Sequence, residues 1–159
     1  MIIPFDPRAH LSKYGVLTVS DLGAKQAVFL QGDAADSIYY IKKGQIQLTV
    51  VSMEGKEAVI AVLGTSDFCG EGCLVGQPLR MVTATTMTQC TVVRMEKATV
   101  IRAIHDDPEF SEFLVSYLLK RTARLTDNLV DQLFNSSEKR LARILLLLAT
   151  MGRKAGLRQ

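Results

Sequence analysis

Between Lys25 and Arg94 the sequence alternates short segments rich in β-branched and aromatic residues with short runs of turn residues. The segments, in chain order, are AVFL, SIYYI, QIQLTVV and EAVIAVL, followed by two more within MVTATTMTQCTVVRM. In QIQLTVV, Ile46, Leu48 and Val50 alternate with polar residues, so one face of an extended strand would be apolar and the other hydrated. Seven or eight short strands with glycine-bearing turns favour a barrel or jelly roll over a parallel α/β sheet.

Composition fits one folded domain. The 159 residues are 48% apolar and 22% charged, which is enough for a core. No apolar run approaches the roughly 18 to 20 residues of a membrane span, and the N-terminal MIIPFDPRAH lacks the basic-then-apolar order of a signal peptide. The odd number of cysteines, Cys69, Cys73 and Cys90, fits a reducing compartment without disulfides. We therefore expect a cytoplasmic protein that has no membrane partner.

From residue 97 onward the pattern becomes helical. Asp107 and Pro108 form a helix start, because an aspartate side chain can cap free amides and proline at the first helical position gives up only an unpaired N–H. A helix from about 108 to 133 would carry a heptad seam, whose members are Val115, Leu118, Thr122, Leu125, Leu129 and Gln132. The seam predicts a homodimer; the alternative is that the stripe packs on the chain's own barrel.

A second helix is predicted after Asn135-Ser136-Ser137-Glu138, because Asn135 and Glu138 have the spacing of a capping pair. It would contain KRLARILLLLATMG, which is apolar on nearly all sides from Ile144 to Ala149 and needs partners on more than one face. Residues 138–159 carry six Lys/Arg against one Asp/Glu, whereas residues 1–137 carry 13 against 15. Such a basic end indicates a segment that faces a polyanion, or a solvated tail.

Two motifs resemble a known family. GDAADSIYYIKKGQIQL (Gly32 to Leu48) resembles the signature of cyclic-nucleotide-binding domains, and LGTSDFCGEGCLVGQPLR (Leu63 to Arg80) resembles their phosphate-binding cassette. The long helix and NSSEKRLARILLLLA are similar to the dimer helix and first DNA-domain helix of bacterial transcription regulators of the cAMP receptor protein and fumarate-nitrate regulator (CRP/FNR) family.

The resemblance implies both a fold and a function. The fold is mainly β with flanking helices: a jelly-roll (double-stranded β-helix) sensor at 1–107, a dimerisation helix at 108–134, and the start of a truncated winged helix-turn-helix domain at 135–159. The parent protein would sense a small-molecule effector, such as cAMP or another cyclic nucleotide, and would read DNA through a C-terminal domain that is largely missing here. The alternatives are a stand-alone regulatory module that does not act on DNA and an orphan sensor without a ligand.

Particular residues would hold the ligand. A cyclic phosphodiester carries one negative charge, which suits free amides after Gly70 and a charge-assisted bond from Arg80. The resemblance implies that Glu71 accepts a hydrogen bond from the ribose 2′-hydroxyl. It also places Arg121 near the ligand and makes Thr126 a contact from the partner subunit.

Three positions depart from the family pattern. A small residue and then alanine would follow the arginine, whereas this chain has Met81 and Val82. Met81 offers no donor to a phosphate oxygen and would crowd it. Leu125 stands where a polar residue would meet the purine. Either another ligand fits, or the pocket is filled by the chain's own side chains.

Other chemistries are disfavoured. No histidine lies between Leu11 and Ile104, so neither a cupin-type metal enzyme nor a nucleophilic triad is expected. His10 and His105 lie outside the β region and do not favour haem, and the first 68 residues contain no cysteine for an iron–sulfur cluster. The three cysteines are a weak metal set and are better explained as buried apolar residues. We predict no enzyme activity and no metal.

Overall fold

The computed structural model describes residues 5–156, but not the side chains of residues 135–137, 140, 143 and 151–156. The chain divides into two units, Met1–Ser111 and Glu112–Gln159.

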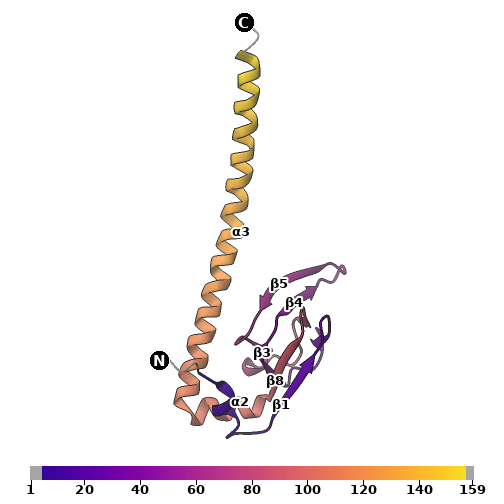
Figure 1. The fold of residues 1–159 in the computed structure, drawn as a ribbon, viewed down its shortest axis with the longest axis vertical. Helices are drawn as coiled ribbons and strands as arrows, with labels where there is room; N and C mark the ends of the chain where they lie inside the picture. Colours follow the sequence, from indigo (N-terminus) through magenta and orange to yellow (C-terminus); the bar gives the residue numbers. More distant parts are fainter. Residues whose placement is uncertain (1–4, 157–159) are drawn as a thin grey trace. The chain divides into compact units, whose positions relative to one another are not determined.

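The first unit contains two sheets of four strands in its described part (Figure 1). In sheet order, one consists of β1 (Leu17–Leu22), β8 (Cys90–Glu96), β3 (Ser37–Lys43) and β6 (Phe68–Cys69). The other consists of β2 (Ala27–Phe29), β7 (Thr83–Thr86), β4 (Ile46–Val51) and β5 (Glu57–Leu63). All neighbouring strands are antiparallel. The predicted mainly β class is confirmed.

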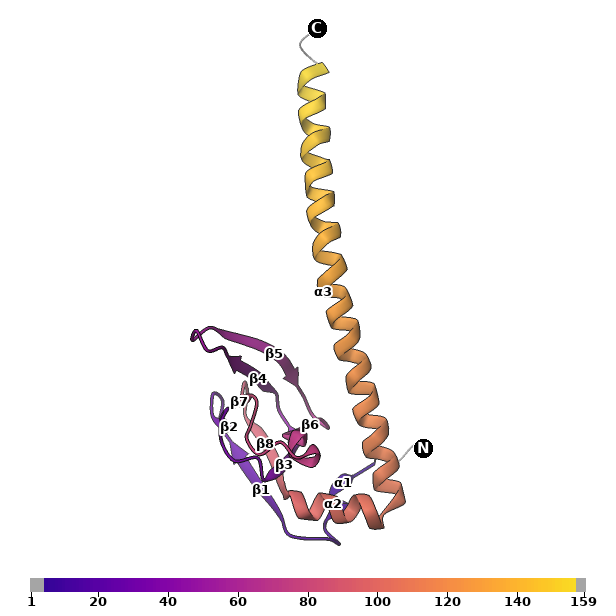
Figure 2. The same ribbon diagram turned by 180° about the vertical axis from the view of Figure 1, so that it is seen from behind.

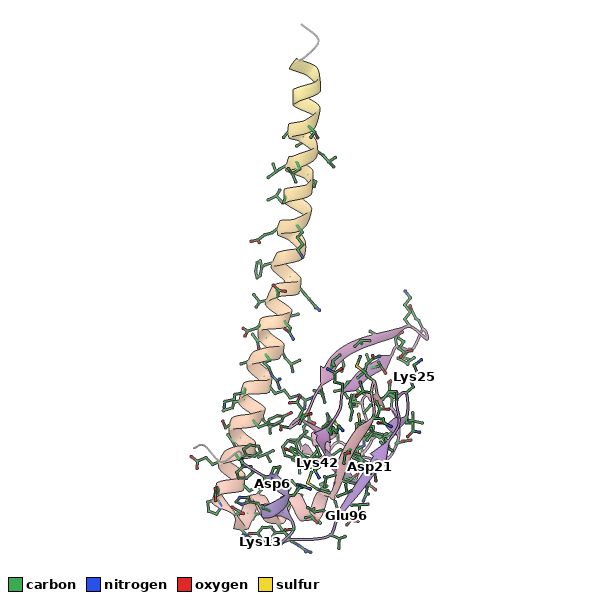
Figure 3. All side chains as sticks on the ribbon, in the orientation of Figure 1. Asp6, Lys13, Asp21, Lys25, Lys42 and Glu96 are labelled. Atoms are coloured by element: carbon green, nitrogen blue, oxygen red, sulfur yellow. The ribbon has the colours of Figure 1, made fainter. Side chains whose placement is uncertain are left out.

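Side chains from both sheets pack into one core. Ile41 of β3 and Ile46 of β4 are fully buried, together with Val92 of β8 and Phe29 of β2. Figure 3 shows side chains filling the space between the sheets, with Lys42 of β3 and Glu96 of β8 labelled. Because successive strand residues point to opposite faces, the apolar alternation read in the sequence becomes this shared core.

The alternation predicted for β4 holds over only part of the strand. Ile46 and Leu48 are buried as expected, but Thr49 is buried too and Val50 is only half-buried. The register of β4 against β5 shifts between Leu48 and Thr49. A bulge at this point reverses the faces of the residues that follow, which is why simple period-two counting fails there.

Three elements have no counterpart in the predicted strands and helices. They are α1 (Pro7–Leu11), β1 and β6. Helix α2 (Lys97–Asp106), which packs beside α1 (Figure 2), starts at residue 97, where the sequence pattern becomes helical. Leu11 of α1 and Val100 and Ala103 of α2 are buried. The Lys25 N–H, in the turn after β1 (Figure 3), donates to the Thr86 carbonyl at 2.7 Å, which ties this end of the barrel to β7.

A single helix, α3 (Pro108–Gly156), makes up nearly all of the second unit and starts where the sequence predicts. Its predicted end near residue 133 and the predicted second start at Asn135 are wrong, because α3 continues through both. No glycine or proline lies between Pro108 and Gly152, and asparagine and serine disfavour a helix only mildly. The Asn135 side chain, and with it the predicted cap, lies outside the described residues, as do the side chains of Arg140, Arg143, Arg153, Lys154 and Arg158.

Asp107 caps the start of α3, as predicted. Its Oδ1 accepts the Phe110 N–H at 3.0 Å, and its Oδ2 lies 2.7 Å from His10 Nδ1, which must donate because an ionised carboxylate only accepts. These bonds, from His10 first and then from the Phe110 amide, hold the pKa of Asp107 below its ordinary value. The pair therefore ties the N-terminal segment to the α2–α3 junction.

We expect Asp107 to contribute a pH-dependent part of the stability. Because its pKa is lowered by folding, the carboxylate stabilises the folded state above its ordinary pKa of 3.8, and this stabilisation is lost as the pH falls through the folded-state value. Thermal unfolding between pH 7 and pH 3 should show Asp107→Asn to be less stable than wild type at neutral pH, with a flatter decline in acid. Exposed Asp131→Asn is the control, and an unchanged acid decline in Asp107→Asn would contradict the assignment.

Candidate anion-binding site

Arg80 lies at the end of the loop that joins β6 to β7, and its side chain is only 5% exposed. Its backbone pairs with the turn after β2: the Arg80 N–H donates to Asp33 O at 2.8 Å, and the Gly32 N–H donates to Arg80 O at 2.9 Å. Ala34 and Leu79 form an isolated antiparallel bridge beside these bonds. The loop is thus held on both sides of the arginine, which directs its side chain inward.

The guanidinium of Arg80 donates hydrogen bonds to main-chain oxygens and to a serine hydroxyl. Nη1 donates to Gly70 O at 3.1 Å, and Nη2 donates to Ser37 O at 2.7 Å and to Ser37 Oγ at 3.1 Å. Its Cζ lies 4.3 Å from the ring centre of Phe29 and 5.9 Å from that of Tyr39, so the cation also faces two aromatic rings.

No carboxylate pairs with this buried charge within the described residues, whose ion pairs lie elsewhere. Arg80 Nε is buried and has no hydrogen-bond partner there. A buried cation without a counter-ion is costly, and so is a buried donor without an acceptor. Both costs would be relieved by an anion with several oxygen acceptors, which is the chemistry that an arginine fork recognises.

Gly70 is the position at which the loop must lack a side chain. Its φ is +82°, and a Cβ atom there would lie 2.6 Å from Arg80 Nη1 and 3.2 Å from Ser37 O. It precedes η1 (Glu71–Val75), a short 3₁₀ helix that is followed by Gly76, also at positive φ. The glycine therefore serves two needs at once: a left-handed backbone and close approach to the guanidinium.

The predicted site residues fall into two groups. In the first unit, Gly70 and Arg80 are in direct contact, Glu71 is half-buried at the start of η1, and Val82 packs against the core. Met81 is 62% exposed, so it takes no part in the core. That Met81 crowds a ligand stays a prediction.

The second group lies on α3. Leu125 is 49% exposed, Arg121 is half-buried, and the Thr126 hydroxyl donates to Thr122 O at 3.0 Å within the helix. Their predicted contacts with a ligand stay predictions.

The sequence analysis missed Ser37, Phe29 and Tyr39, which surround the guanidinium. Ser37 and Tyr39 stand inside the quoted Gly32-to-Leu48 signature, but nothing in their spacing links them to Arg80. Only the pairing of strands from distant parts of the chain brings them together.

Cys73 shares an acceptor with the arginine. It is buried in η1, and its Sγ donates to Ser37 O at 3.7 Å. Burial raises the pKa of the thiol, while the neighbouring positive charge of Arg80 acts in the opposite direction. Cys73 is therefore a neutral thiol that packs beside the Arg80 guanidinium. All three cysteines are buried free thiols, the role that the sequence favours.

Comparison with known proteins decides the family. The family model described as "Cyclic nucleotide-binding domain" matches residues 20–107, which include Arg80 and the residues that surround its guanidinium. The chain belongs to the cyclic nucleotide-binding domain family. Within it, the chain is 33% identical over 144 residues to the "CRP-like cAMP-activated global transcriptional regulator" of Mycobacterium tuberculosis, which covers 91% of this chain and 64% of the relative. The chain thus spans just under two thirds of that relative's length.

Solved structures show the same fold. One is the c-di-GMP responsive global regulator of Xanthomonas campestris. It superposes with a TM-score of 0.69 at 22% identity, covering 86% of this chain and 68% of the other. The catabolite activator protein of Thermus thermophilus gives a TM-score of 0.65 at 23% identity, covering 83% and 60%. Both structures share the fold of this chain over most of its length.

No described helix is long and apolar enough to cross a membrane. No cluster of three or more histidine, cysteine or acidic side chains suited to a metal ion occurs in the part of the chain that the structure describes.

Gly70→Ala should be more damaging than Gly55→Ala. Both glycines have a φ of +82°, but a Cβ at Gly55 would meet nothing within 4 Å. The left-handed backbone alone costs alanine about 1 kcal/mol, and only at Gly70 must the guanidinium also move. Urea unfolding should show a loss of about 1 kcal/mol for Gly55→Ala and at least about 2 kcal/mol for Gly70→Ala. Equal losses in the free energy of unfolding would mean that the clash with Arg80 does not contribute to the effect of Gly70→Ala.

Proposed function

We propose that this chain is the effector-sensing and dimerisation part of a bacterial CRP/FNR-type transcription regulator, and that it binds a cyclic nucleotide or a related ligand through the ligand's phosphate. The observation that carries the proposal is Arg80, a buried guanidinium with an unpartnered Nε and no ion pair among the described residues. Family membership and the resemblance to a cAMP-activated regulator support it. The M. tuberculosis relative and the X. campestris structure are both named as regulators.

A phosphate would bind first at the guanidinium donor that the protein leaves unpaired, Arg80 Nε. Nη1 and Nη2 donate to the oxygens of Gly70 and Ser37, which hold the guanidinium in place. A charged phosphate oxygen is a stronger acceptor than a peptide carbonyl and neutralises the buried charge as well. Binding is therefore expected to satisfy Nε and offset the buried charge while the guanidinium keeps its contacts with Gly70 and Ser37.

Two nucleotides are candidates for the ligand. The named relatives respond to different ligands, cAMP in M. tuberculosis and c-di-GMP in X. campestris. In this chain Met81 and Val82 replace the small residue and alanine of the family pattern, so both positions carry larger apolar side chains and Met81 offers no donor to a phosphate oxygen. We therefore propose a ligand of the cyclic nucleotide class and test both compounds.

Helix α3 is proposed to join two copies of the chain. Val115, Leu125 and Leu129 of the predicted seam are each about half exposed, and Leu118 is half-buried. The hydroxyl of Thr122, a polar member of the seam, donates to Leu118 O at 3.0 Å, so it can enter an apolar interface without an unpaired donor. The signal would favour one packing of this seam over another and thereby alter the parent regulator's affinity for DNA. In that parent, a segment beyond this chain would contact the DNA.

Calorimetric titration with cAMP and with cyclic di-GMP tests the proposed function. Wild type should bind one of them, and Arg80→Gln should weaken that binding at least tenfold, because the charge-assisted bonds to phosphate are lost. Exposed Arg102→Gln is the control and should bind like wild type, with circular dichroism confirming that each variant is folded. If the folded wild type binds neither compound, the nucleotide part of the proposal is wrong.

Met81→Ser addresses the departure from the family pattern. If a bulky side chain and a missing donor weaken cAMP binding, this substitution should strengthen it. No gain would show that residue 81 does not limit the site.

Sedimentation velocity tests the dimer. Wild type should sediment as a dimer at tens of micromolar, and Leu129→Asp should shift it towards monomer, because a carboxylate in an apolar seam is left desolvated. Asn128→Asp adds the same charge one position off the seam and should remain dimeric. A monomeric wild type would rule out the seam.

A further inference from the structure

The polar contacts of Arg80 continue beyond its own shell into a chain of hydrogen bonds. Ser37 Oγ accepts from Arg80 Nη2 at 3.1 Å and donates to Asp36 Oδ1 at 3.1 Å. Ser37 is 1% exposed, at the start of β3. The Asp36 side chain is 68% exposed, and its Oδ1 lies 3.6 Å from Arg94 Nη2 on β8. A buried cation is thus connected to a surface carboxylate through one hydroxyl.

The direction of these bonds matters because a hydroxyl has only one proton. An ionised carboxylate can only accept, so the proton of Ser37 points to Asp36, and a lone pair of its oxygen points to the guanidinium. Without Asp36 the hydroxyl could rotate and point its proton at the cation. Asp36 therefore keeps the hydroxyl in the orientation that attracts Nη2.

The backbone holds this arrangement in place. The Asp36 carbonyl accepts the Lys97 N–H at 3.0 Å, which ties the start of β3 to the start of α2. Ser37 pairs with Glu96 in the β3–β8 register. Because these contacts fix the backbone of both Asp36 and Ser37, the Ser37 hydroxyl can hold the guanidinium in one orientation.

We infer that Ser37, oriented by Asp36, is a positioning residue that sets the direction of the Arg80 guanidinium and thereby its affinity for an anionic ligand. The part concerning affinity rests on the proposed function; the part concerning orientation does not. Ser37 does not need to touch the ligand in order to act. It limits the rotation of Nη2, so that Arg80 is ordered before the ligand arrives and less entropy is lost on binding.

Nitrogen-15 NMR of the arginine side chains tests the orientation without any ligand. In wild type, rotation about the Cζ–Nη bonds of Arg80 should be hindered and should give separate Nη–H signals, which Arg80→Lys identifies by their disappearance. In Ser37→Ala these signals should merge by fast rotation, and in Ser37→Thr, which restores the hydroxyl, they should separate again. Ser20→Ala, a serine substitution on β1 of the same sheet, should match wild type.

Two surface variants separate the role of Asp36 from that of its ion pair. Asp36→Asn should give faster rotation than wild type, because the amide can donate to Ser37 and turn the hydroxyl proton towards the cation. Arg94→Gln breaks the Asp36–Arg94 pair but leaves the bond to Ser37, so its Arg80 signals should match wild type. If Arg94→Gln and Asp36→Asn behave alike, Asp36 does not orient the hydroxyl.

Titration with cAMP and cyclic di-GMP then completes the test. For whichever compound wild type binds, Ser37→Ala should lower the affinity about tenfold and Ser37→Thr should restore it. Unchanged NMR signals in Ser37→Ala, or merged signals with unchanged affinity, would overturn the inference. If wild type binds neither compound while Ser37→Ala still merges the signals, the proposed ligand class fails and the positioning of Arg80 by Ser37 stands.

Discussion

A buried positive charge without an ionic partner among the described residues is the constraint around which the barrel's loops are arranged. Arg80 is surrounded by carbonyls, a hydroxyl and two aromatic rings, none of which carries a full negative charge. Such an environment tolerates a guanidinium, which is weakly hydrated and planar, better than it would an ammonium. It also leaves part of the desolvation cost unmet, and this residual cost is the physical basis for the proposed binding of an anion.

Four segments that are distant in sequence must meet to build this environment. Phe29 ends β2, Ser37 begins β3, Gly70 follows β6, and Arg80 precedes β7. The two antiparallel sheets bring these strand ends to one place, and hydrogen bonds from the Gly32–Asp33 turn hold Arg80 there. The family relationship fits this geometry, because the matched range of residues 20–107 contains all four segments.

Helix α3, unlike the surroundings of Arg80, forms from local sequence signals alone. Asp107 accepts the Phe110 amide and a bond from His10, Pro108 occupies the first position, and no helix breaker follows until Gly152. Its apolar side chains remain largely exposed in the single chain, from Val115 to Leu148. A helix of this kind has the local signals to form but needs a partner for its apolar surface, which is the physical basis for the proposed dimer.

The sequence alone determined the strand-rich class and the start of α3, because each depends on local signals: residue period and a cap. It also placed Gly70 and Arg80 in one loop, and the structure shows them in contact. It failed where distant residues decide the outcome. The bulge after Leu48 reversed the faces of β4, and α3 ran through Asn135, where weak capping signals lose to an unbroken run of helix-compatible residues. Ser37, Phe29 and Tyr39 were beyond its reach, because only strand pairing across some 40 to 50 residues of chain places them against the guanidinium. Tertiary structure therefore decided how the charge of Arg80 is held, since burial and the partners of a charge are properties of the folded chain.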